Sequence, residues 1–173
     1  MSARHRYLVA LGSNRRHPRF GSPRKTIAAA AEHFAEAGIE LRELSQVIET
    51  APLGPSRRRF ANAAALVASA LSPLDLLAGL QEIERSFGRR RRGQPWGERV
   101  LDLDIVLWSG GVWATADLTI PHPLFRTRAF VLRPLAQIAP DWRDPLTGLT
   151  VRQLHARLTR PRAIPRHPAW SGP

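Results

Sequence analysis

Cysteine is absent from the 173 residues of this chain, which excludes disulfide bonds, thiolate metal sites and a cysteine nucleophile. The absence agrees with a reducing compartment, and we expect a cytoplasmic protein. Long hydrophobic runs are missing as well. The apolar stretch Phe60–Leu74 is interrupted by Asn62, Ser69 and Pro73 before it reaches the ~20 residues that a bilayer requires. The apolar run at residues 7–12 is too short for a signal peptide, so we expect no membrane contact.

Lysine is nearly absent too, because Lys25 is the single lysine and arginine supplies almost all the positive charge behind a formal net charge of +12. Such a field attracts polyanions, either nucleic acid or a nucleoside triphosphate, whose phosphates arginine grips bidentately. Aromatic residues do not alternate with the basic ones, as a base-stacking platform would require. We assign Arg57, Arg58 and Arg59 to solvated surface and predict no nucleic-acid partner.

Periodicity and turn residues predict strands and helices along the chain. The expected elements are strand 7–11, helix 22–38, strand 39–47, helix 72–88, a strand within 99–108, turn 110–111, an extended piece at 118–120 and helix 151–158. Ser22 and Ser72 are the predicted N-caps, each followed by proline, and Gly38 and Gly88 end the two helices. A bulge is expected near Leu44.

This order of elements fits an α+β sandwich, with helices packed on a mostly antiparallel sheet. Residues 60–71 are rich in alanine, and their local propensity favours a helix. From Thr159 the chain turns to proline and arginine. We therefore expect a single domain at residues 1–158 and a flexible tail at residues 159–173.

Asp102 and Asp104 stand two residues apart in the apolar segment Arg99–Trp108. Side chains alternate along a strand, so both carboxylates face one side, with a rise of roughly 6.6 Å between them. Hard cations such as Mg²⁺ take oxygen ligands of this kind. The preceding run Arg89–Arg99 adds guanidinium groups, a combination typical of phosphoryl transfer. The ordinary alternative is a strand with one solvated face.

The same segment resembles the Arg-Trp-Gly-Pro-Arg-Thr-Leu-Asp-Leu-Asp-Ile motif of the 6-hydroxymethyl-7,8-dihydropterin pyrophosphokinases of folate synthesis. Further matches lie on both sides of it in the family's order: Ala10–Asn14, Thr50–Gly54, Phe60–Ala64, Gln81–Glu84, Gly88–Arg89, Ile120–Pro123, Arg128–Phe130 and Pro134–Leu135. An ordered set of motifs is far more specific than one motif. The chain is thus similar to this family over about residues 5–155.

The resemblance implies a ferredoxin-like core, with a strand and not a helix at residues 60–71. It also implies the reaction, in which a pyrophosphoryl group moves from ATP to the hydroxymethyl oxygen of a reduced pterin and AMP is released. Divalent metal and fixed cations hold the charge that develops when the β-phosphorus is attacked. The implied partners are two small-molecule substrates, ATP and the pterin, and we expect a monomer.

By motif match, Asp102 and Asp104 ligate two Mg²⁺ ions. Two alternatives remain for activation of the pterin hydroxyl. Asp104 acts as a base that takes its proton, or polarisation of the oxygen by the metal is sufficient. The resemblance assigns catalytic roles to Asp102, Asp104, Arg89, Arg91, Arg92 and Arg99. The ATP-binding set that it implies is Gln81, Glu84, Arg89, Arg91, Arg92, Trp96, Arg99, Ile105, Thr119, His122 and Arg128. The four consecutive arginines at 89–92 leave their individual roles open.

The implied pterin site combines aromatic faces with polar groups at the ring edge. Its members are Thr50, Ala51, Leu53, Phe60, Asn62, Trp96, Asp102 and Phe130. Phe60 and Phe130 match the aromatic positions, and Asn62 matches the amide that reads the pterin edge. Trp96 matches a mobile-loop residue that closes the site and excludes water. Without the resemblance, both phenylalanines would be interpreted as core.

Besides the first loop at residues 15–18, to which no chemistry is assigned, four positions depart from the family's usual pattern. Pro95 stands where a basic residue commonly precedes Trp-Gly, and Glu98 stands where proline is common. Phe60 replaces a frequent tyrosine, and Ala51 replaces a proline. The change at Pro95 leaves open a binding protein that keeps both ligand sites without catalysis, and the arginine content leaves open a nucleic-acid-binding module. The remaining matches favour the enzyme.

Overall fold

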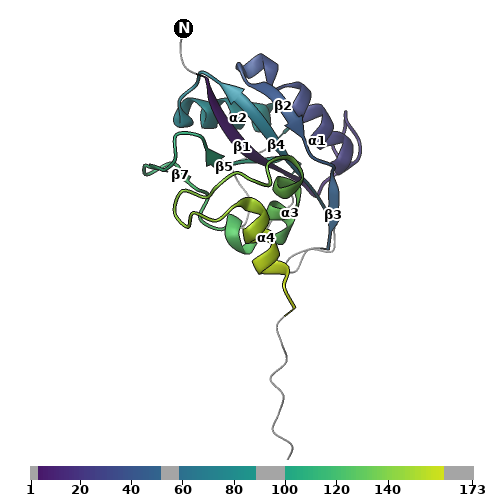
Figure 1. Cartoon of the computed structure of the whole chain (residues 1–173). Coiled ribbons are helices and arrows are strands. Elements are labelled where there is room, and N and C mark those ends of the chain that lie inside the picture. The colour runs from purple at the N-terminus through teal and green to yellow at the C-terminus, as the bar shows by residue number, and fades with distance from the viewer. Residues whose placement is uncertain (1–3, 52–58, 89–99, 162–173) are drawn as a thin grey trace, which may run out of the picture.

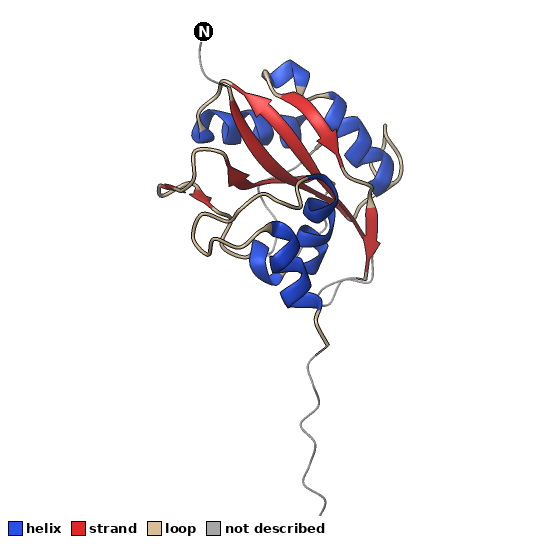
Figure 2. Ribbon diagram, in the orientation of Figure 1, coloured by secondary structure: helices blue, strands red, loops and turns tan. Residues whose placement is uncertain are grey.

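The computed structural model describes residues 4–51, 59–88 and 100–161. Five strands form one antiparallel sheet in the order β2-β4-β1-β5, and β3 also pairs with β4. Their bounds are β1 His5–Ser13, β2 Glu40–Leu44, β3 Ile48–Thr50, β4 Phe60–Ser69 and β5 Asp102–Trp108, and a small second sheet pairs β6 Trp113–Ala114 with β7 Thr119–Ile120. Figure 2 shows the strands as a twisted layer between helices. The predicted α+β class with an antiparallel sheet is confirmed.

Helices cover both faces of this sheet. Their bounds are α1 Pro23–Glu32, α2 Pro73–Ser86, α3 Ala129–Ile138 and α4 Val151–Thr159, with 3-10 turns at Ala35–Ala37 and Phe125–Thr127. α1 and α2 lie on one face, and α3 and α4 lie on the other (Figure 1). The buried apolar side chains accordingly form two clusters, one on each face of the sheet. No helix in the described part of the chain is long and apolar enough to cross a membrane.

The two predicted N-caps are confirmed. The hydroxyl of Ser22 accepts a hydrogen bond from the backbone of Lys25, and the hydroxyl of Ser72 accepts one from Asp75. α1 ends at Glu32, earlier than predicted, and Gly38 closes the 3-10 turn that follows it with φ of 69°. The predicted helix at residues 151–158 is confirmed as α4.

β4 is the strand that the family resemblance implied, despite the helical propensity of its alanines. It lies between β1 on one side and β2 with β3 on the other. Its small side chains enter both clusters, since Ala63 and Ala65 pack toward α1 and α2 while Ala64 packs toward α3 and α4. Strand pairing on both edges therefore outweighs local propensity.

The strand predicted at residues 39–47 is found as β2, but it ends at Leu44, and the separate strand β3 begins only at Ile48. Ser45 interrupts the ladder after β2, where its hydroxyl accepts a hydrogen bond from the backbone of Ala64 at 2.9 Å. Thr50 is the last residue of β3. The register shift of β2 lies between Leu41 and Glu43, earlier than the bulge expected near Leu44.

Two further elements were not expected from the sequence, α3 and the short strand β6. Pro134 lies inside α3 and has no N–H to donate, a pattern that normally argues against a helix. α3 forms because Val131, Leu132 and Leu135 pack with the buried ring of Phe125. Tertiary packing therefore stabilises a helix that contains a proline.

Candidate active site

Asn62, Gly12 and Asp102 form one row across three strands, and we call this row the site floor. Gly12 of β1 pairs with Asn62 of β4 and with Asp102 of β5. A methyl group at Gly12 would lie 3.8 Å from Oδ1 of Asn62 and 3.9 Å from Cβ of Asp102. Because glycine has no side chain, the floor stays open between an amide and a carboxylate. It lies on the sheet face that α3 and α4 cover further along.

Asp104 occupies the next row of the sheet, where Ala10 pairs with both Asp104 and Ala64. Asp102 and Asp104 are partly exposed, whereas Leu103 between them is only 3% exposed. The strand thus presents both carboxylates on one face, as their spacing predicts.

Asn62 is buried, and Thr50 orients it. Nδ2 of Asn62 donates a hydrogen bond to the hydroxyl of Thr50 at 3.0 Å. Oδ1 of Asn62 lies toward Gly12, so the amide presents an acceptor to any ligand on the floor. Thr50 pairs with Phe60 in the neighbouring row, so the structure brings three predicted pterin residues together. Ala51 follows Thr50 directly and is exposed.

A second group of predicted residues lies between β7 and α3. The backbone N–H of His122 donates to the carbonyl of Val106 at 3.0 Å, which attaches this segment to the outer edge of β5. Nδ1 of His122 accepts a hydrogen bond from the backbone of Leu124, so the neutral ring carries its hydrogen on Nε2. Arg128 precedes α3, and its guanidinium lies 5.8 Å from the ring centre of Phe130.

Electrostatics link these residues to the floor. Burial lowers the pKa of His122, and Arg128 lowers this pKa further, while Asp102 and a backbone hydrogen bond raise it. The imidazole is therefore neutral near pH 7 and acts as a hydrogen-bond donor. A cation, a neutral donor and two carboxylates are thus combined in one site. This combination suits a phosphate ligand that reaches the carboxylates through a divalent cation.

The other described members of the predicted ATP set lie on β5 or on the neighbouring α2 and β7. Glu84 is 3% exposed, and its Oε1 accepts a hydrogen bond from the backbone of Leu103 at 2.7 Å. This contact satisfies an outward amide of the edge strand and holds α2 against it. Gln81 is half-buried one turn earlier on α2, Ile105 is buried in the α1 and α2 cluster, and Thr119 is exposed on β7. Their roles toward ATP stay predictions.

Several predicted site residues lie outside the described residues: Leu53, Arg89, Arg91, Arg92, Trp96 and Arg99. The two unusual loop positions, Pro95 and Glu98, lie outside them as well. Their proposed contacts with substrates stay predictions.

The described residues hold no group of three or more His, Cys, Asp or Glu side chains that could bind a metal ion by themselves. Asp102 and Asp104 nevertheless supply two carboxylates on one face. Mg²⁺ commonly takes one or two carboxylates and completes its shell with water and substrate phosphates. The donor set therefore fits a cation that arrives with a phosphate ligand.

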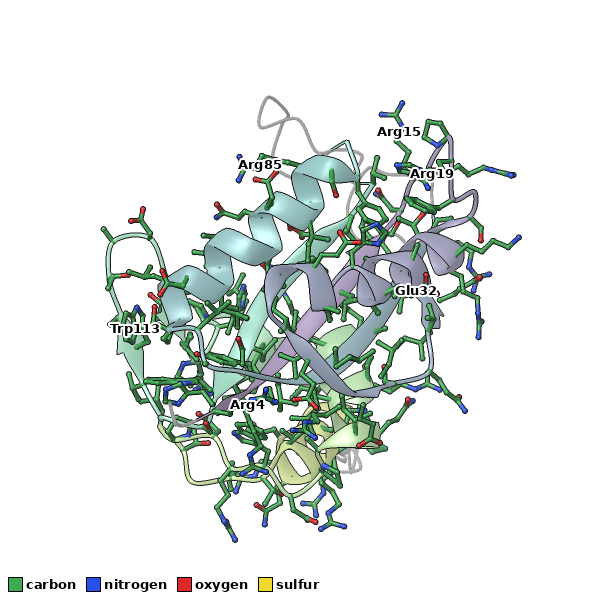
Figure 3. All side chains as sticks on the ribbon, turned by 90° about the horizontal axis from the view of Figure 1, so that it is seen from above. Arg4, Arg15, Arg19, Glu32, Arg85 and Trp113 are labelled. Carbon is green, nitrogen blue, oxygen red and sulfur yellow. The ribbon has the colours of Figure 1, made fainter. Side chains whose placement is uncertain are left out.

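Many arginines lie on the surface. Arg15, Arg19 and Arg85 are exposed, and Figure 3 shows all three at the periphery of the molecule. Arg85 forms an ion pair with Glu82 on the same helix. Exposed pairs of this kind contribute little to stability, so net charge alone does not define a site.

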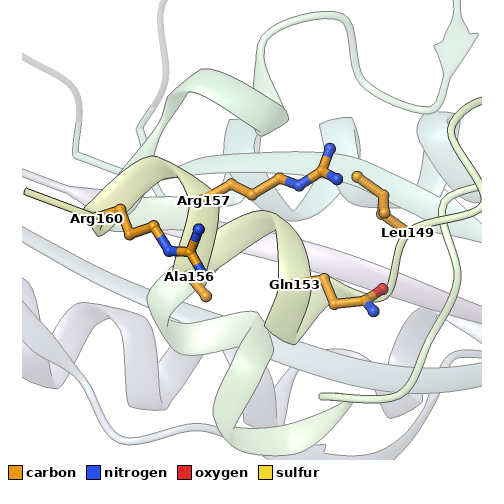
Figure 4. A pocket seen from close by; sticks show the side chains of 5 residues that line it. All are labelled: Leu149, Gln153, Ala156, Arg157 and Arg160. Atoms are coloured by element: carbon orange, nitrogen blue, oxygen red, sulfur yellow. The ribbon is translucent and has the colours of Figure 1, made fainter. Parts of the chain in front are cut away.

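A pocket of about 250 Å³ lies on α4 (Figure 4). Its lining is Leu149, Gln153, Ala156, Arg157 and Arg160. None of the predicted site residues lines it, and both of its arginines are exposed. We therefore assign the chemistry to the floor and not to this pocket.

Sequence reasoning assigned no role to Gly12. A glycine near the end of a strand is a signal for close approach of a ligand or another backbone, and that signal was available at this position. The sequence did not reveal that Gly12 pairs with Asn62 and Asp102, because these residues lie 50 and 90 positions further along the chain.

Comparison with known proteins identifies the family. The family model for 7,8-dihydro-6-hydroxymethylpterin-pyrophosphokinase matches residues 8–140. A 2-amino-4-hydroxy-6-hydroxymethyldihydropteridine pyrophosphokinase from Synechocystis is 44% identical over 126 residues, which are 73% of this chain and 64% of that protein. Proteins of the same name from Pseudomonas aeruginosa and Methylorubrum extorquens are 43% and 38% identical, covering 81% and 88% of this chain and 84% and 93% of their own lengths.

Solved structures share the fold. The chain has a TM-score of 0.67 with a crystal structure of HPPK-DHPS in complex with substrates and 0.68 with Plasmodium falciparum HPPK-DHPS, at 14% and 13% identity. The matches cover 90% and 91% of this chain but only 43% and 45% of those longer chains, so they support the ferredoxin-like fold alone. With the family model matched over most of its length, the chain belongs to the 6-hydroxymethyl-7,8-dihydropterin pyrophosphokinase family.

Proposed function

We propose that the chain transfers the diphosphate group of ATP to the hydroxymethyl oxygen of 6-hydroxymethyl-7,8-dihydropterin, giving the pterin diphosphate and AMP in folate biosynthesis. Its family supports this reaction. The observation that carries the proposal is the site floor, which joins an amide acceptor, an open surface and a carboxylate pair on one sheet face. A flat heterocycle lying on this floor directs its substituent toward Asp102 and Asp104.

The pterin end of the site uses shape and hydrogen bonds. Oδ1 of Asn62 accepts from a ring-edge N–H, and the bond to Thr50 holds the amide in that orientation. Phe60 and Phe130 supply aromatic faces for the ring, both of them half-buried and available for contact. Phe60 stands where tyrosine is frequent in the family, and its ring still provides a face for stacking.

The phosphate end of the site uses donors that stay fixed during the reaction. Nε2 of neutral His122 donates to a phosphate oxygen, and Arg128 supplies a cation beside it. Arg89, Arg91, Arg92 and Arg99 add further guanidinium groups in the proposal, and Trp96 helps to close the site against water.

Asp102 and Asp104 are the proposed ligands of two Mg²⁺ ions. Bound Mg²⁺ would neutralise the triphosphate and polarise the reacting oxygens. The hydroxymethyl oxygen attacks the β-phosphorus, and the bond from this phosphorus to the oxygen that bridges to the α-phosphate breaks. AMP leaves with that bridging oxygen. The hydroxyl proton is lost in the same step, and we assign Asp104 to receive it.

The deciding experiment incubates the purified chain with MgATP and 6-hydroxymethyl-7,8-dihydropterin and identifies the products. We expect AMP and the pterin diphosphate in equal amounts. Formation of ADP, or no pterin-dependent turnover under varied metal and salt, would remove the assignment. Pterin binding without turnover would then support the binding-protein alternative that Pro95 leaves open.

We also propose that the protein acts in the cytoplasm as a monomer, with small molecules as its substrates. The cysteine-free sequence agrees with that location. Sedimentation at micromolar concentration tests the monomer, and a dimer would refute it.

A further inference from the structure

Arg126, which is partly exposed, forms an ion pair with the buried Asp144, and Arg126 is close in sequence to the proposed triphosphate ligands. Nε and Nη2 of Arg126 donate to the two carboxylate oxygens of Asp144, each at 2.7 Å. Asp144 is 0% exposed and also accepts from the backbone of Leu146 at 3.1 Å and from the hydroxyl of Thr147 at 2.6 Å. Burial raises the pKa of the Asp144 carboxyl, but the hydrogen bonds lower it more, so the net shift is downward. The carboxylate stays ionised near neutral pH.

Both members of the pair have fixed surroundings. The guanidinium of Arg126 lies 4.7 Å from the ring centre of Phe125, which is fully buried among residues of α3 and α4. Asp144 lies in a turn closed by two backbone hydrogen bonds, from its own N–H to Leu149 at 2.9 Å and from Gly148 to its carbonyl at 2.8 Å. A bidentate bond between two anchored groups fixes orientation as well as distance.

The pair lies on the segment that carries the phosphate donors. Arg126 sits in the 3-10 turn between His122 and Arg128. His122 is bonded to the edge of β5, and the carbonyl of Arg128 accepts the first bonds of α3. Arg126 is the charged link between this turn and the loop that contains Asp144.

We propose that Arg126 and Asp144 are a positioning pair, which holds the turn so that His122 and Arg128 face the triphosphate before ATP binds. This inference rests on the proposed function, since it takes His122 and Arg128 as phosphate ligands. Donors that are already ordered lose little entropy on binding, so breaking the pair weakens ATP binding, while Thr50 and Asn62 on β3 and β4 keep the hydrogen bond that orients the pterin acceptor.

Calorimetric titration of the full chain with MgATP, and separately with the pterin, tests the pair. We expect Asp144→Asn and Arg126→Lys to weaken MgATP binding about tenfold and pterin binding by clearly less, because Phe130 is the one proposed pterin residue on this segment. Arg126→Lys keeps the charge and removes the bidentate geometry. Asp141→Asn is the matched control, because Asp141 pairs with Arg152 nearby while both side chains are exposed. It should bind MgATP like the parent.

Leu154→Ala controls for stability, because it removes a buried side chain from the same cluster as Phe125. All titrations are made well below the unfolding temperature of each variant. Parent-like MgATP affinity in both pair variants overturns the proposal, and so does an equal loss in Leu154→Ala. If the parent binds MgATP but forms no AMP, the proposed reaction fails, while a selective loss of MgATP affinity in the pair variants still supports the positioning pair.

Discussion

The two faces of β5 differ although they share one backbone. On one face, Leu103 and Ile105 are buried against α1 and α2. On the other, Asp102 and Asp104 are partly exposed beside the open floor at Gly12. Adjacent residues therefore serve stability and chemistry separately, because the alternation of side chains divides the strand between a core and a site. Substitutions at neighbouring positions should show this separation.

The largest effect is expected on the core face. Leu103→Ala removes a buried side chain and leaves a cavity, and it should lower the free energy of unfolding by about 3 kcal/mol. Urea unfolding measures this loss, and turnover per folded molecule should stay close to that of the parent. Unchanged stability with lost turnover would contradict the division between the faces.

Asp104→Asn tests the opposite face one residue later. The change keeps the shape and removes a charge, so turnover should fall at least about a hundredfold, equivalent to about 2.7 kcal/mol of lost transition-state stabilisation. Thermal stability without metal should be unchanged or slightly higher, because repulsion from Asp102 is relieved. Steady-state kinetics and thermal unfolding measure the two quantities. A variant that turns over at the parent rate would refute the role of the metal ligands.

Asn62→Ala probes the floor itself. Removing the amide leaves the pterin edge without its acceptor, and pterin affinity should fall about tenfold while ATP affinity changes little. Separate titrations of the two ligands measure this. Equal losses for both ligands would indicate a folding defect or a misplaced site.

Gly12→Ala places a methyl group on the floor without a clash in the protein, since its neighbours stand 3.8 and 3.9 Å away. We expect a normal fold and about fivefold weaker pterin binding. Gly79→Ala is the matched control on α2, where the added methyl meets Ala37 at ordinary contact distance. It should leave pterin binding unchanged and raise stability by about 0.5 to 1 kcal/mol. If Gly12→Ala bound the pterin more tightly, the proposal that the heterocycle lies on the floor at Gly12 would be wrong.

The smallest effect is a pH dependence of stability. The pKa of His122 is lowered in the folded state from an ordinary value of 6.5, so the unfolded chain binds more protons as pH falls below that value. The contribution of His122 to stability is therefore complete above about pH 6.5 and is lost as pH falls toward the lowered pKa. Burial and Arg19 also lower the pKa of His17, so His17 changes stability with pH in the same direction as His122. Urea unfolding at pH 5.5 and 7.5 measures the free energy of unfolding at each pH. The difference between the two values should be smaller for His122→Gln than for the parent.

Local sequence signals predicted the elements whose causes are local. The caps at Ser22 and Ser72 and the apolar stripe of α2 depend on residues within a few turns, and they were found where expected. α3 was not expected, because a proline at position 134 argues against a helix in the sequence. The helix is stabilised by packing of its apolar side against Phe125. The predicted residues Thr50, Phe60 and Asn62 do come together, but that expectation came from the family resemblance and not from the pattern itself.

The sequence by itself determined the starts of α1 and α2 and the shared face of Asp102 and Asp104, because capping and alternation act over a few residues. Tertiary structure decided that the alanine-rich β4 is a strand, that Gly12 stands between Asn62 and Asp102, and that Arg126 meets Asp144. These outcomes depend on strand register and on contacts between distant segments. Such contacts form only after long loops close, and the free energy that selects them is shared among many residues across the fold.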